Sequence, residues 1–401
     1  MTDYDVAVVG AGLAGLHTAR RLGERGLKVL LVDAKASVDQ AVHTTGIFVR
    51  RTLEDFDLPE ACLGPPVRRV VLLSPRGRAL ALDSPRDEFR VGRMGALYRR
   101  WLDETVRAGV EWAPRTRYAG CVHGPTETVL LLEDAEGPRE ARARFVVGAD
   151  GAASRVARGL GLDENREWIV GVEEVWRGAL PDAPPAFHCW LDPVLAPGYI
   201  AWVVADGEET HVGVGGHAAR FRPAEALKAF HARVAERFGI ADRAPDERRG
   251  GRIPVGGVLA NIANRRGLLV GDAAGAVSPL TAGGLDPCLR LSELAAHVAV
   301  EYVATGDEAA LLAYSGARFR AHFRKRIAMR RALSSIRSPL LAEAACAGLR
   351  LPGVRAAAHG VFFGRGSFPD VAPRPSSRTI HESGELPRAA VPSGAAGAAA
   401  R

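Results

Sequence analysis

The sequence predicts an α/β protein: a doubly wound, Rossmann-type nucleotide-binding domain, an inserted antiparallel β-sheet domain, and C-terminal helices. Three observations support this fold class. A strand, a glycine-rich turn and a helix open the chain, and short β-rich segments separated by turn residues fill residues 168–216. Long segments with helical periodicity follow residue 285.

The first 33 residues have the pattern of a βαβ unit. Residues 4–9 (YDVAVV) are apolar and β-rich, as expected for a central parallel strand. Residues 12–25 place small and apolar side chains at helical spacing, and residues 27–32 form a second strand ending at Asp33. The predicted strand, helix and strand therefore fit within about 30 residues, the usual length of such a unit.

Three glycines lie between the first strand and its helix. Gly10 permits a tight turn, Gly12 permits close approach of a phosphate, and Gly15 permits packing of the helix on the strand. The helix N-terminus offers free N–H groups to a pyrophosphate. Asp33 is placed to accept hydrogen bonds from a ribose hydroxyl, and the absence of Arg or Lys at this position disfavours a 2′-phosphate.

The remaining elements are expected in a simple order along the chain. They are a helix at 94–108, strands at 121–122, 128–133 and 145–147, strands at 169–176, 187–191, 199–204 and 211–215, a helix at 223–238, a strand at 268–270, and helices at 285–303, 307–332 and 339–363. Because the first sheet resumes at Leu268, the β-rich middle is predicted to be an insertion. Residues beyond 366 are rich in Pro, Ser, Ala and Gly, which favours an unfolded tail.

These elements predict a discontinuous domain organisation. We expect a nucleotide-binding domain of 1–55, 88–165 and 255–310, a β-sheet domain of 56–87 and 166–254, a helical region of 311–365, and a disordered tail of 366–401.

The composition indicates which broad class of protein the chain belongs to. The 401 residues are 47% hydrophobic and 25% charged, as in soluble globular proteins, and no apolar run approaches the length of a membrane span. The N-terminus lacks the features of a signal peptide, so a cytoplasmic location is expected. Five scattered cysteines without a CxxC pair predict neither a disulfide framework nor a metal site.

The net charge of +7 is concentrated in residues 318–337, which contain no acid. Such a segment is typical of a solvated helix face, or of a patch that contacts an anionic membrane or an acidic substrate. No nucleic-acid-binding motif accompanies it, so nucleic acid is not an expected partner.

Residues 267–287 (GLLVGDAAGAVSPLTAGGLDP) carry the clearest ligand signal. A short apolar strand ends at Asp272, and the next fifteen residues have almost no side-chain bulk. This pattern predicts that a large ligand lies against bare backbone.

This segment, residues 146–155 (VVGADGAASR) and the N-terminal glycine motif together resemble an FAD-dependent group that includes p-hydroxybenzoate hydroxylase and the geranylgeranyl reductase family. The resemblance implies noncovalent FAD. Asp272 would contact the ribityl chain and pyrophosphate region, the loop from Pro279 to Gly284 would lie against the isoalloxazine ring, and the following helix would point its N-terminus at the ring.

The resemblance also assigns further FAD contacts. Arg93 matches an arginine that binds the phosphate or adenosine portion, and residues 43–46 fall where relatives run a small-residue segment past the flavin; His43 is as easily an idle loop residue as a near-flavin donor. The remaining implied contacts are Leu13, Ala14, Ala34, Thr45, Gly46, Asp150, Gly151, Ala273, Thr281 and Gly283.

Residues 196–202 and 212–216 are similar to the geranylgeranyl reductase branch, in which a Tyr-x-Trp-x-Phe-Pro element lines the substrate cavity. Here Tyr199 and Trp202 are three apart instead of two, and Val203-Val204-Ala205 replaces Phe-Pro. Both aromatics are candidate substrate-lining residues or simply core residues. Tyr199 is also a candidate catalytic proton donor, provided its pKa is lowered.

The expected reaction is hydride transfer from reduced flavin to a carbon–carbon double bond of a small hydrophobic substrate of isoprenoid or lipid type. The alternatives are a flavin monooxygenase acting on an aromatic or polyketide-like substrate, and a catalytically silent flavin-binding protein. NADPH or NADH is the expected external reductant, without a second nucleotide-binding motif; a redox partner protein is the alternative.

Overall fold

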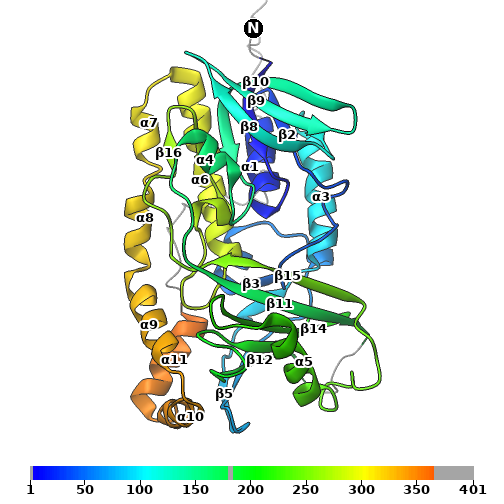
Figure 1. Ribbon diagram of the computed structural model, residues 1–401, viewed down its shortest axis with the longest axis vertical. Helices are drawn as coiled ribbons and strands as arrows, with labels where there is room; N and C mark the ends of the chain where they lie inside the picture. Colours follow the sequence, from blue (N-terminus) through cyan, green and yellow to red (C-terminus); the bar gives the residue numbers. More distant parts are fainter. Residues whose placement is uncertain (1–2, 179–183, 365–401) are drawn as a thin grey trace, which may run out of the picture. The chain divides into compact units, whose positions relative to one another are not determined.

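The computed structural model describes residues 3–178 and 184–364, so the predicted tail of 366–401 lies outside the described residues. Its α/β architecture, with a Rossmann-like sheet and a second, mainly antiparallel sheet, confirms the predicted fold class (Figure 1).

The first sheet is built on parallel strands in the order β17-β10-β1-β2-β7. β16 pairs antiparallel with β17 at one edge, and β8 and β9 form an antiparallel extension of β10. The four residues of β2 and the last four of β1 are fully buried, which explains their continuous apolar sequence. The strands are β1 (Tyr4–Val9), β2 (Val29–Val32), β7 (Glu111–Ala113), β8 (Arg117–His123), β9 (Thr128–Asp134), β10 (Gly137–Gly148), β16 (Ala263–Asn264) and β17 (Gly267–Leu269).

Helices pack against this sheet, and the expected glycine-rich turn directly precedes the first of them. α1 (Leu13–Gly23) contacts both α3 (Met94–Arg107) and α6 (Leu285–Thr305), while the short α4 (Arg155–Leu160) packs on β8. Gly12 is the N-cap residue of α1, and Gly284 is the N-cap residue of α6. The helix starts predicted near Gly12 and at Leu285 are therefore confirmed.

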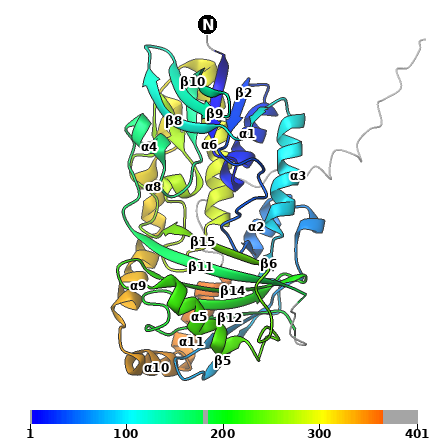
Figure 2. The same ribbon diagram turned by 45° about the vertical axis from the view of Figure 1, so that its right-hand side comes forward.

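The second sheet has the order β15-β11-β14-β13-β12-β4-β5 and is antiparallel except between β12 and β4. α5 (Pro223–Val234) packs on β11 and β14, as Figure 2 shows. β15 had no sequence signal because it is a polar, glycine-rich edge strand (ERRGGRIP). The strands are β4 (Arg69–Leu73), β5 (Ala79–Asp83), β11 (Trp168–Arg177), β12 (Ala186–Trp190), β13 (Ala201–Ala205), β14 (Glu209–His217) and β15 (Glu247–Pro254).

A small two-stranded sheet connects the two larger ones. β3 (Ile47–Val49) pairs with β6 (Phe89–Val91), and the chain continues from β3 into α2 (Arg50–Asp55), while a short 3-10 helix, η1 (Glu60–Cys62), packs near α3. Buried Arg290 of α6 forms ion pairs with Asp286, 2.8 Å away, and Asp55, 2.6 Å away. These pairs fix the start of α6 against α2, and β3 places residues 43–46 beside it.

The predicted single helix at 307–332 is wrong. The segment forms α7 (Ala309–Leu312), α8 (Gly316–His322) and α9 (Arg324–Ser335). The break follows from Tyr314, which is buried and donates a hydrogen bond to the Leu269 carbonyl at 2.7 Å. Ser315 then caps α8 by accepting from the Arg318 N–H.

The predicted C-terminal helical segment is a hairpin of α10 (Pro339–Gly348) and α11 (Pro352–Phe363). Pro352 starts the second helix, as its fixed φ and missing N–H favour. Arg350 and Arg355 donate to the Ala79 and Ala81 carbonyls of β5, so the hairpin lies beside this edge of the second sheet (Figures 1 and 2). No helix among the described residues is long and apolar enough to span a membrane.

Candidate functional site

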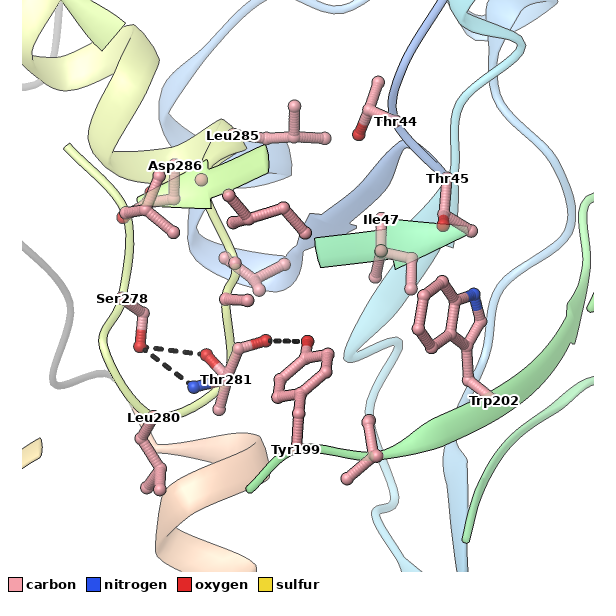
Figure 3. Close-up of a pocket in the computed structure, with 18 of the residues that line it drawn as sticks. Thr44, Thr45, Ile47, Tyr199, Trp202, Ser278, Leu280, Thr281, Leu285 and Asp286 are labelled. Carbon is pink, nitrogen blue, oxygen red and sulfur yellow. Dashed lines mark hydrogen bonds between the residues drawn. The ribbon is translucent and has the colours of Figure 1, made fainter. Parts of the chain in front are cut away.

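A cavity of about 1040 Å³ runs from the glycine-rich turn to the α10–α11 hairpin. One wall comes from the first sheet and its turns, and a second wall comes from β11, β13 and β15. The inner faces of α9, α10 and α11 close the far end. Figure 3 shows the central part, where Thr45, Tyr199, Trp202 and Thr281 lie around the same space.

The glycine-rich turn has the geometry expected of a phosphate cradle. Gly10 has φ +103°, and a Cβ on it would collide with the Ala149 carbonyl; a Cβ on Gly15 would collide with the Gly10 carbonyl. A Cβ on Gly12, in contrast, meets no protein atom within 4 Å, and this residue lines the cavity. Gly10 and Gly15 therefore maintain the turn, whereas Gly12 leaves space in front of it.

Asp33 braces this turn. Its carboxylate accepts hydrogen bonds from the backbone N–H groups of Ala11 at 2.7 Å and Lys35 at 2.8 Å. It is not among the cavity-lining residues. A ribose contact from Asp33 stays a prediction.

The loop after Asp272 is held by side chains from other elements. The Tyr199 hydroxyl donates to the Thr281 carbonyl at 2.8 Å, Arg326 donates to Ser278 Oγ at 2.9 Å, and Arg330 donates to the Pro279 carbonyl at 3.3 Å. Arg326 and Arg330 belong to the basic segment 318–337, so this segment is not a uniformly solvated face: Arg330 is buried.

Asp272 lies in η2 (Gly271–Ala274), a 3-10 turn at the end of β17. Burial raises the pKa of its carboxyl to about 6. Among the described residues, no donor forms a hydrogen bond with this carboxylate, which lines the cavity beside Gly284. A partly buried carboxylate without a donor is costly unless a ligand supplies one, and the hydroxyls of a ribityl chain would do so.

Tyr199 does not have the property that a proton donor needs. Burial raises the pKa of its phenol instead of lowering it, and its hydroxyl hydrogen is already donated to Thr281. The expectation that Tyr199 is the catalytic proton donor is therefore not supported. Tyr199 precedes β13, contrary to the predicted strand, and packs edge-on against Trp202 with ring centroids 6.3 Å apart.

Two other expected FAD contacts face elsewhere. The Arg93 guanidinium forms an ion pair with Glu208 at 3.0 Å and donates to the Ala61 carbonyl at 3.2 Å. The Asp150 carboxylate accepts from Ser154 Oγ and from backbone N–H groups at the start of α4. In these contacts both side chains stabilise the fold, and neither lines the cavity.

The expected site residues divide into two sets. The cavity is lined by Gly12, Leu13, Ala14, Thr45, Gly46, Gly151, Tyr199, Trp202, Asp272, Thr281, Gly283 and Gly284. It is not lined by Gly10, Gly15, Asp33, Ala34, Arg93, Asp150, Ala273 or Pro279.

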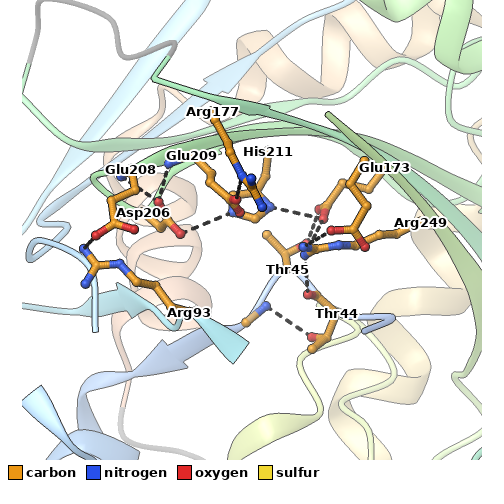
Figure 4. A network of polar contacts seen from close by, with 12 residues as sticks. Thr44, Thr45, Arg93, Glu173, Arg177, Asp206, Glu208, Glu209, His211 and Arg249 are labelled. Carbon is orange, nitrogen blue, oxygen red and sulfur yellow. Dashed lines mark hydrogen bonds and ion pairs between the residues drawn. The ribbon is translucent and has the colours of Figure 1, made fainter. Parts of the chain in front are cut away.

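The sequence analysis missed a buried polar network on the opposite wall (Figure 4). Glu173 of β11 accepts from Thr45 Oγ1 and, at 3.1 Å, from Trp202 Nε1. Its second oxygen lies 3.2 Å from His211 Nδ1 and 3.7 Å from the Arg249 guanidinium. The available signal was Glu173-Glu174, two consecutive acids inside an otherwise apolar strand (WIVGVEEVWR).

Comparisons with known proteins identify the family. Residues 96–329 match the family model described as FAD binding domain, and residues 5–63 match that described as FAD dependent oxidoreductase. Digeranylgeranylglycerophospholipid reductase 1 of Methanopyrus kandleri is 32% identical over 320 residues, which cover 77% of this chain and 83% of the relative. The chain belongs to the geranylgeranyl reductase family of FAD-dependent oxidoreductases.

Other relatives and solved structures agree with this family. Digeranylgeranylglycerophospholipid reductase 2 of the same organism is 30% identical, with 77% of this chain and 80% of the relative covered. A geranylgeranyl bacteriochlorophyll reductase-like structure from Thermoplasma acidophilum has a TM-score of 0.76 at 21% identity, covering 84% of this chain and 89% of that one. A p-nitrophenol 4-monooxygenase from Pseudomonas putida shares the fold, with a TM-score of 0.69 at 20% identity over 91% and 94% of the chains.

The residues present fit FAD. The open space at Gly12 suits a pyrophosphate, the unpartnered Asp272 suits the ribityl hydroxyls, and the N-terminus of α6 suits the electron-rich edge of a reduced flavin. This member of the geranylgeranyl reductase family is thus an FAD-dependent oxidoreductase.

Gly12→Val should fold normally but fail to retain FAD. A Cβ added at Gly12 meets no protein atom within 4 Å, and the backbone there has φ −79° and ψ −171°, which valine tolerates. The valine side chain would instead occupy the space in front of the turn. The flavin-to-protein ratio and the melting temperature of the purified variant measure this. Gly348→Val, also in open space but away from the cavity, is the matched control. A Gly12→Val protein with bound flavin equal to that of the wild type would contradict the assignment.

Asp272→Asn should stabilise the protein without FAD and weaken FAD binding. At pH 7 the folded chain carries a partly buried carboxylate whose ionisation is disfavoured, and Asn removes that charge. The gain should shrink as the pH falls from about 6 towards 3.8, the ordinary aspartate pKa, because the carboxyl is then protonated in both states. FAD affinity should fall roughly 10- to 100-fold, for ~1.5–3 kcal/mol of hydrogen bonding to a charged acceptor.

Thermal melts of apo-protein from pH 4 to 8 and equilibrium flavin titrations measure the two effects separately. If Asp272→Asn stabilised the apo-protein and also strengthened FAD binding, or weakened both, Asp272 would not face the cofactor.

Proposed function

We propose that this protein reduces carbon–carbon double bonds in the isoprenoid chains of a lipid. Bound reduced FAD supplies the hydride. The relatives named digeranylgeranylglycerophospholipid reductase support the class of substrate, and so does the shape of the cavity.

The observation that carries this proposal is the change of chemistry along one continuous cavity. Near the glycine-rich turn and Asp272 the lining includes bare glycine backbone and polar side chains such as Lys35; at the other end it is made mainly by apolar side chains of α9, α10 and α11. Those lining side chains are Leu333, Ile336, Ala345, Leu349, Val354, Ala358, Val361 and Phe362. An apolar chain would therefore be buried along this end with its reacting carbons near Tyr199 and Trp202.

The residues around the middle of the cavity bind and orient. Tyr199 fixes the loop at Thr281, and Trp202 is held by its hydrogen bond to Glu173, so both rings have defined positions. Apolar rings and small side chains around a reacting double bond would exclude water from it.

Anaerobic turnover tests the reaction. Protein reduced under argon and mixed with digeranylgeranylglycerophospholipid in detergent should return its flavin to the oxidised state and yield product heavier by two hydrogens per double bond reduced. Mass spectrometry of the lipid and the flavin absorbance measure this. Substrate-dependent oxygen uptake with a product one oxygen heavier would show the monooxygenase alternative instead.

We also propose that a nicotinamide nucleotide reduces the flavin from outside, without a second binding domain. Stopped-flow bleaching of the oxidised protein by NADPH and by NADH, with and without lipid, is the measurement. Bleaching by either nucleotide is the expected result. No bleaching by both, followed by bleaching with reduced ferredoxin or flavodoxin, would assign the electron supply to a redox partner protein.

We propose that the α10–α11 hairpin contacts an anionic membrane surface. Leu340, Leu341 and Leu351 are 67%, 61% and 60% exposed, although α10 also lines the cavity with its inner face. The single acid of this hairpin, Glu343, is buried and bonded to Ser74. Contact through the hairpin replaces the expected contact through residues 318–337, whose Arg326 and Arg330 are directed at the loop after Asp272.

Paired Leu340→Glu and Leu341→Glu substitutions should abolish co-sedimentation with vesicles containing anionic phospholipid, because buried apolar area and attraction to the headgroups are both lost. Leu312→Glu on α7 changes a leucine that is 76% exposed outside the hairpin, and it should leave co-sedimentation unchanged. Equal binding by all these proteins would reject the hairpin as the contact. A concentration-dependent dimer that the paired substitutions disrupt would assign the face to a second copy of the chain.

A further inference from the structure

We propose that Glu173 delivers the proton that completes the reduction, and that His211 and Asp206 are positioning residues that keep this proton available. The inference rests on the proposed function, because a double bond that accepts a hydride at one carbon must accept a proton at the other.

Glu173 is the acid of the network that reaches the cavity. Its side chain is 5% exposed and lines the wall formed by β11, next to Thr45 and Trp202. The hydrogen bonds from Thr45 Oγ1, which Figure 4 shows, and from Trp202 Nε1 fix one carboxylate oxygen at this position.

A buried imidazole stands behind Glu173 and away from the cavity. His211 Nδ1 lies 3.2 Å from Glu173 Oε1, and His211 Nε2 lies 3.8 Å from Asp206 Oδ2. Asp206 is itself fixed by the backbone N–H groups of Glu208 and Glu209, which donate at 2.8 and 2.6 Å. The Glu209 carboxylate also lies within 4.8 Å of the imidazole, and it is itself paired with Arg177 at 3.1 Å. The imidazole is thus surrounded by three carboxylates, of which Glu173 lines the cavity.

The charges around this pair favour a stored proton. Burial lowers the pKa of His211, but the carboxylates of Glu173 and Asp206 outweigh it and raise that pKa to about 9. The Arg249 guanidinium, on β15, faces Glu173 at 3.7 Å and does not cancel this effect. Glu247 is paired with Arg249 at 2.7 Å. At neutral pH the proton therefore resides on His211, with Glu173 ionised, since its pKa is lowered by His211, Thr45 and Arg249.

Other acids and phenols along the cavity are less suited. Burial raises the pKa of Tyr199, and its hydrogen is committed to Thr281. Asp286 is paired with Arg290 at the start of α6, and Glu88 is paired with Arg50. Asp192 is paired with Arg233 at 3.0 Å, and burial raises the pKa of the Tyr98 phenol. Asp272 has no partner that would return a proton to it among the described residues.

The step balances without a further reagent. One carbon of the double bond takes the hydride of the bound reduced flavin, and the other forms a C–H bond with a proton from Glu173. Glu173 receives that proton from His211 Nδ1, so the pair ends as carboxylate and neutral imidazole. His211 takes a proton from solvent before the next cycle.

The pH dependence of the second half-reaction tests this. Pre-reduced protein is mixed anaerobically with digeranylgeranylglycerophospholipid, and flavin reoxidation is followed from pH 6 to 10.5. The wild-type rate should be level below pH 9 and fall about tenfold per unit above it. Glu173→Gln should be slowed at least 100-fold with unchanged flavin content, in line with the usual contribution of a general acid. His211→Gln should be slow with no decline near pH 9.

Glu174→Gln is the matched control. Glu174 is buried on the same strand but faces the other side, where it pairs with Arg248 at 3.0 Å, and it does not line the cavity. It should retain the wild-type rate. A Glu173→Gln rate within threefold of wild type, or a wild-type rate that stays level through pH 9, overturns the proposal. The wild-type profile decides the matter even if neither variant folds.

A second readout is independent of turnover. In ¹H–¹⁵N spectra of the FAD-free protein, one imidazole should titrate near pH 9, disappear in His211→Gln and titrate at lower pH in Glu173→Gln. Absence of such a resonance overturns the stored proton. Failure of the reduced wild type to transfer hydride to the lipid at all would instead reject the proposed function, and the proton-delivery role with it.

Discussion

The loop from Asp272 to Gly284 must leave one of its sides bare, and much of the structure follows from this constraint. A flat ring can pack against backbone only where side chains are missing, and such a backbone has few groups of its own to hold its shape. The required hydrogen bonds therefore come from elsewhere: from Tyr199 before β13, and from Arg326 and Arg330 of α9. In this way both the second sheet and the C-terminal helices are hydrogen-bonded to the loop from Asp272 to Gly284.

Two carboxylates, one partly buried and one fully buried, line the same cavity with opposite electrostatic surroundings. Asp272 has no donor among the described residues, and burial raises its pKa, whereas Glu173 is surrounded by donors and cations that lower its pKa. The first arrangement leaves an acceptor free for a ligand that brings its own hydroxyls. The second stabilises a charge within the protein itself. The two walls of the cavity therefore have different tasks, although both present an acid.

The glycine-rich turn could be interpreted from the sequence, whereas the polar network on the opposite wall of the cavity could not. Gly10, Gly12 and Gly15 could be interpreted because each is constrained by neighbours within one βαβ unit. Glu173 and His211 are brought together by the pairing of β11 with β14, and no local pattern encodes that register. The ion pair of Arg93 could not be predicted for the same reason, since its partner Glu208 lies in a distant turn.

The strand and helix predictions were correct where the signal is local in the sequence, and wrong or missing where it depends on distant contacts. Buried strands such as β1 can be recognised by their continuous apolar residues, whereas β15 pairs along an edge of its sheet and needs no such pattern. The break between α7 and α8 depends on Tyr314 reaching Leu269, a contact 45 residues away along the chain. Periodicity alone could not have located it.

The α10–α11 hairpin has two faces with separate surroundings, which has an evolutionary consequence. Ala345 and Leu349 face the cavity, whereas Leu340 and Leu341 are exposed on the same short stretch of chain. Substitutions of the inward residues change the length and width of the cavity at this end, and leave the exposed face as it was. Substitutions of the outward residues change the surface that the hairpin presents to its surroundings, and leave the lining of the cavity as it was. The shape of the cavity and the character of this surface can therefore diverge independently among descendants of this protein, by changes in a single hairpin.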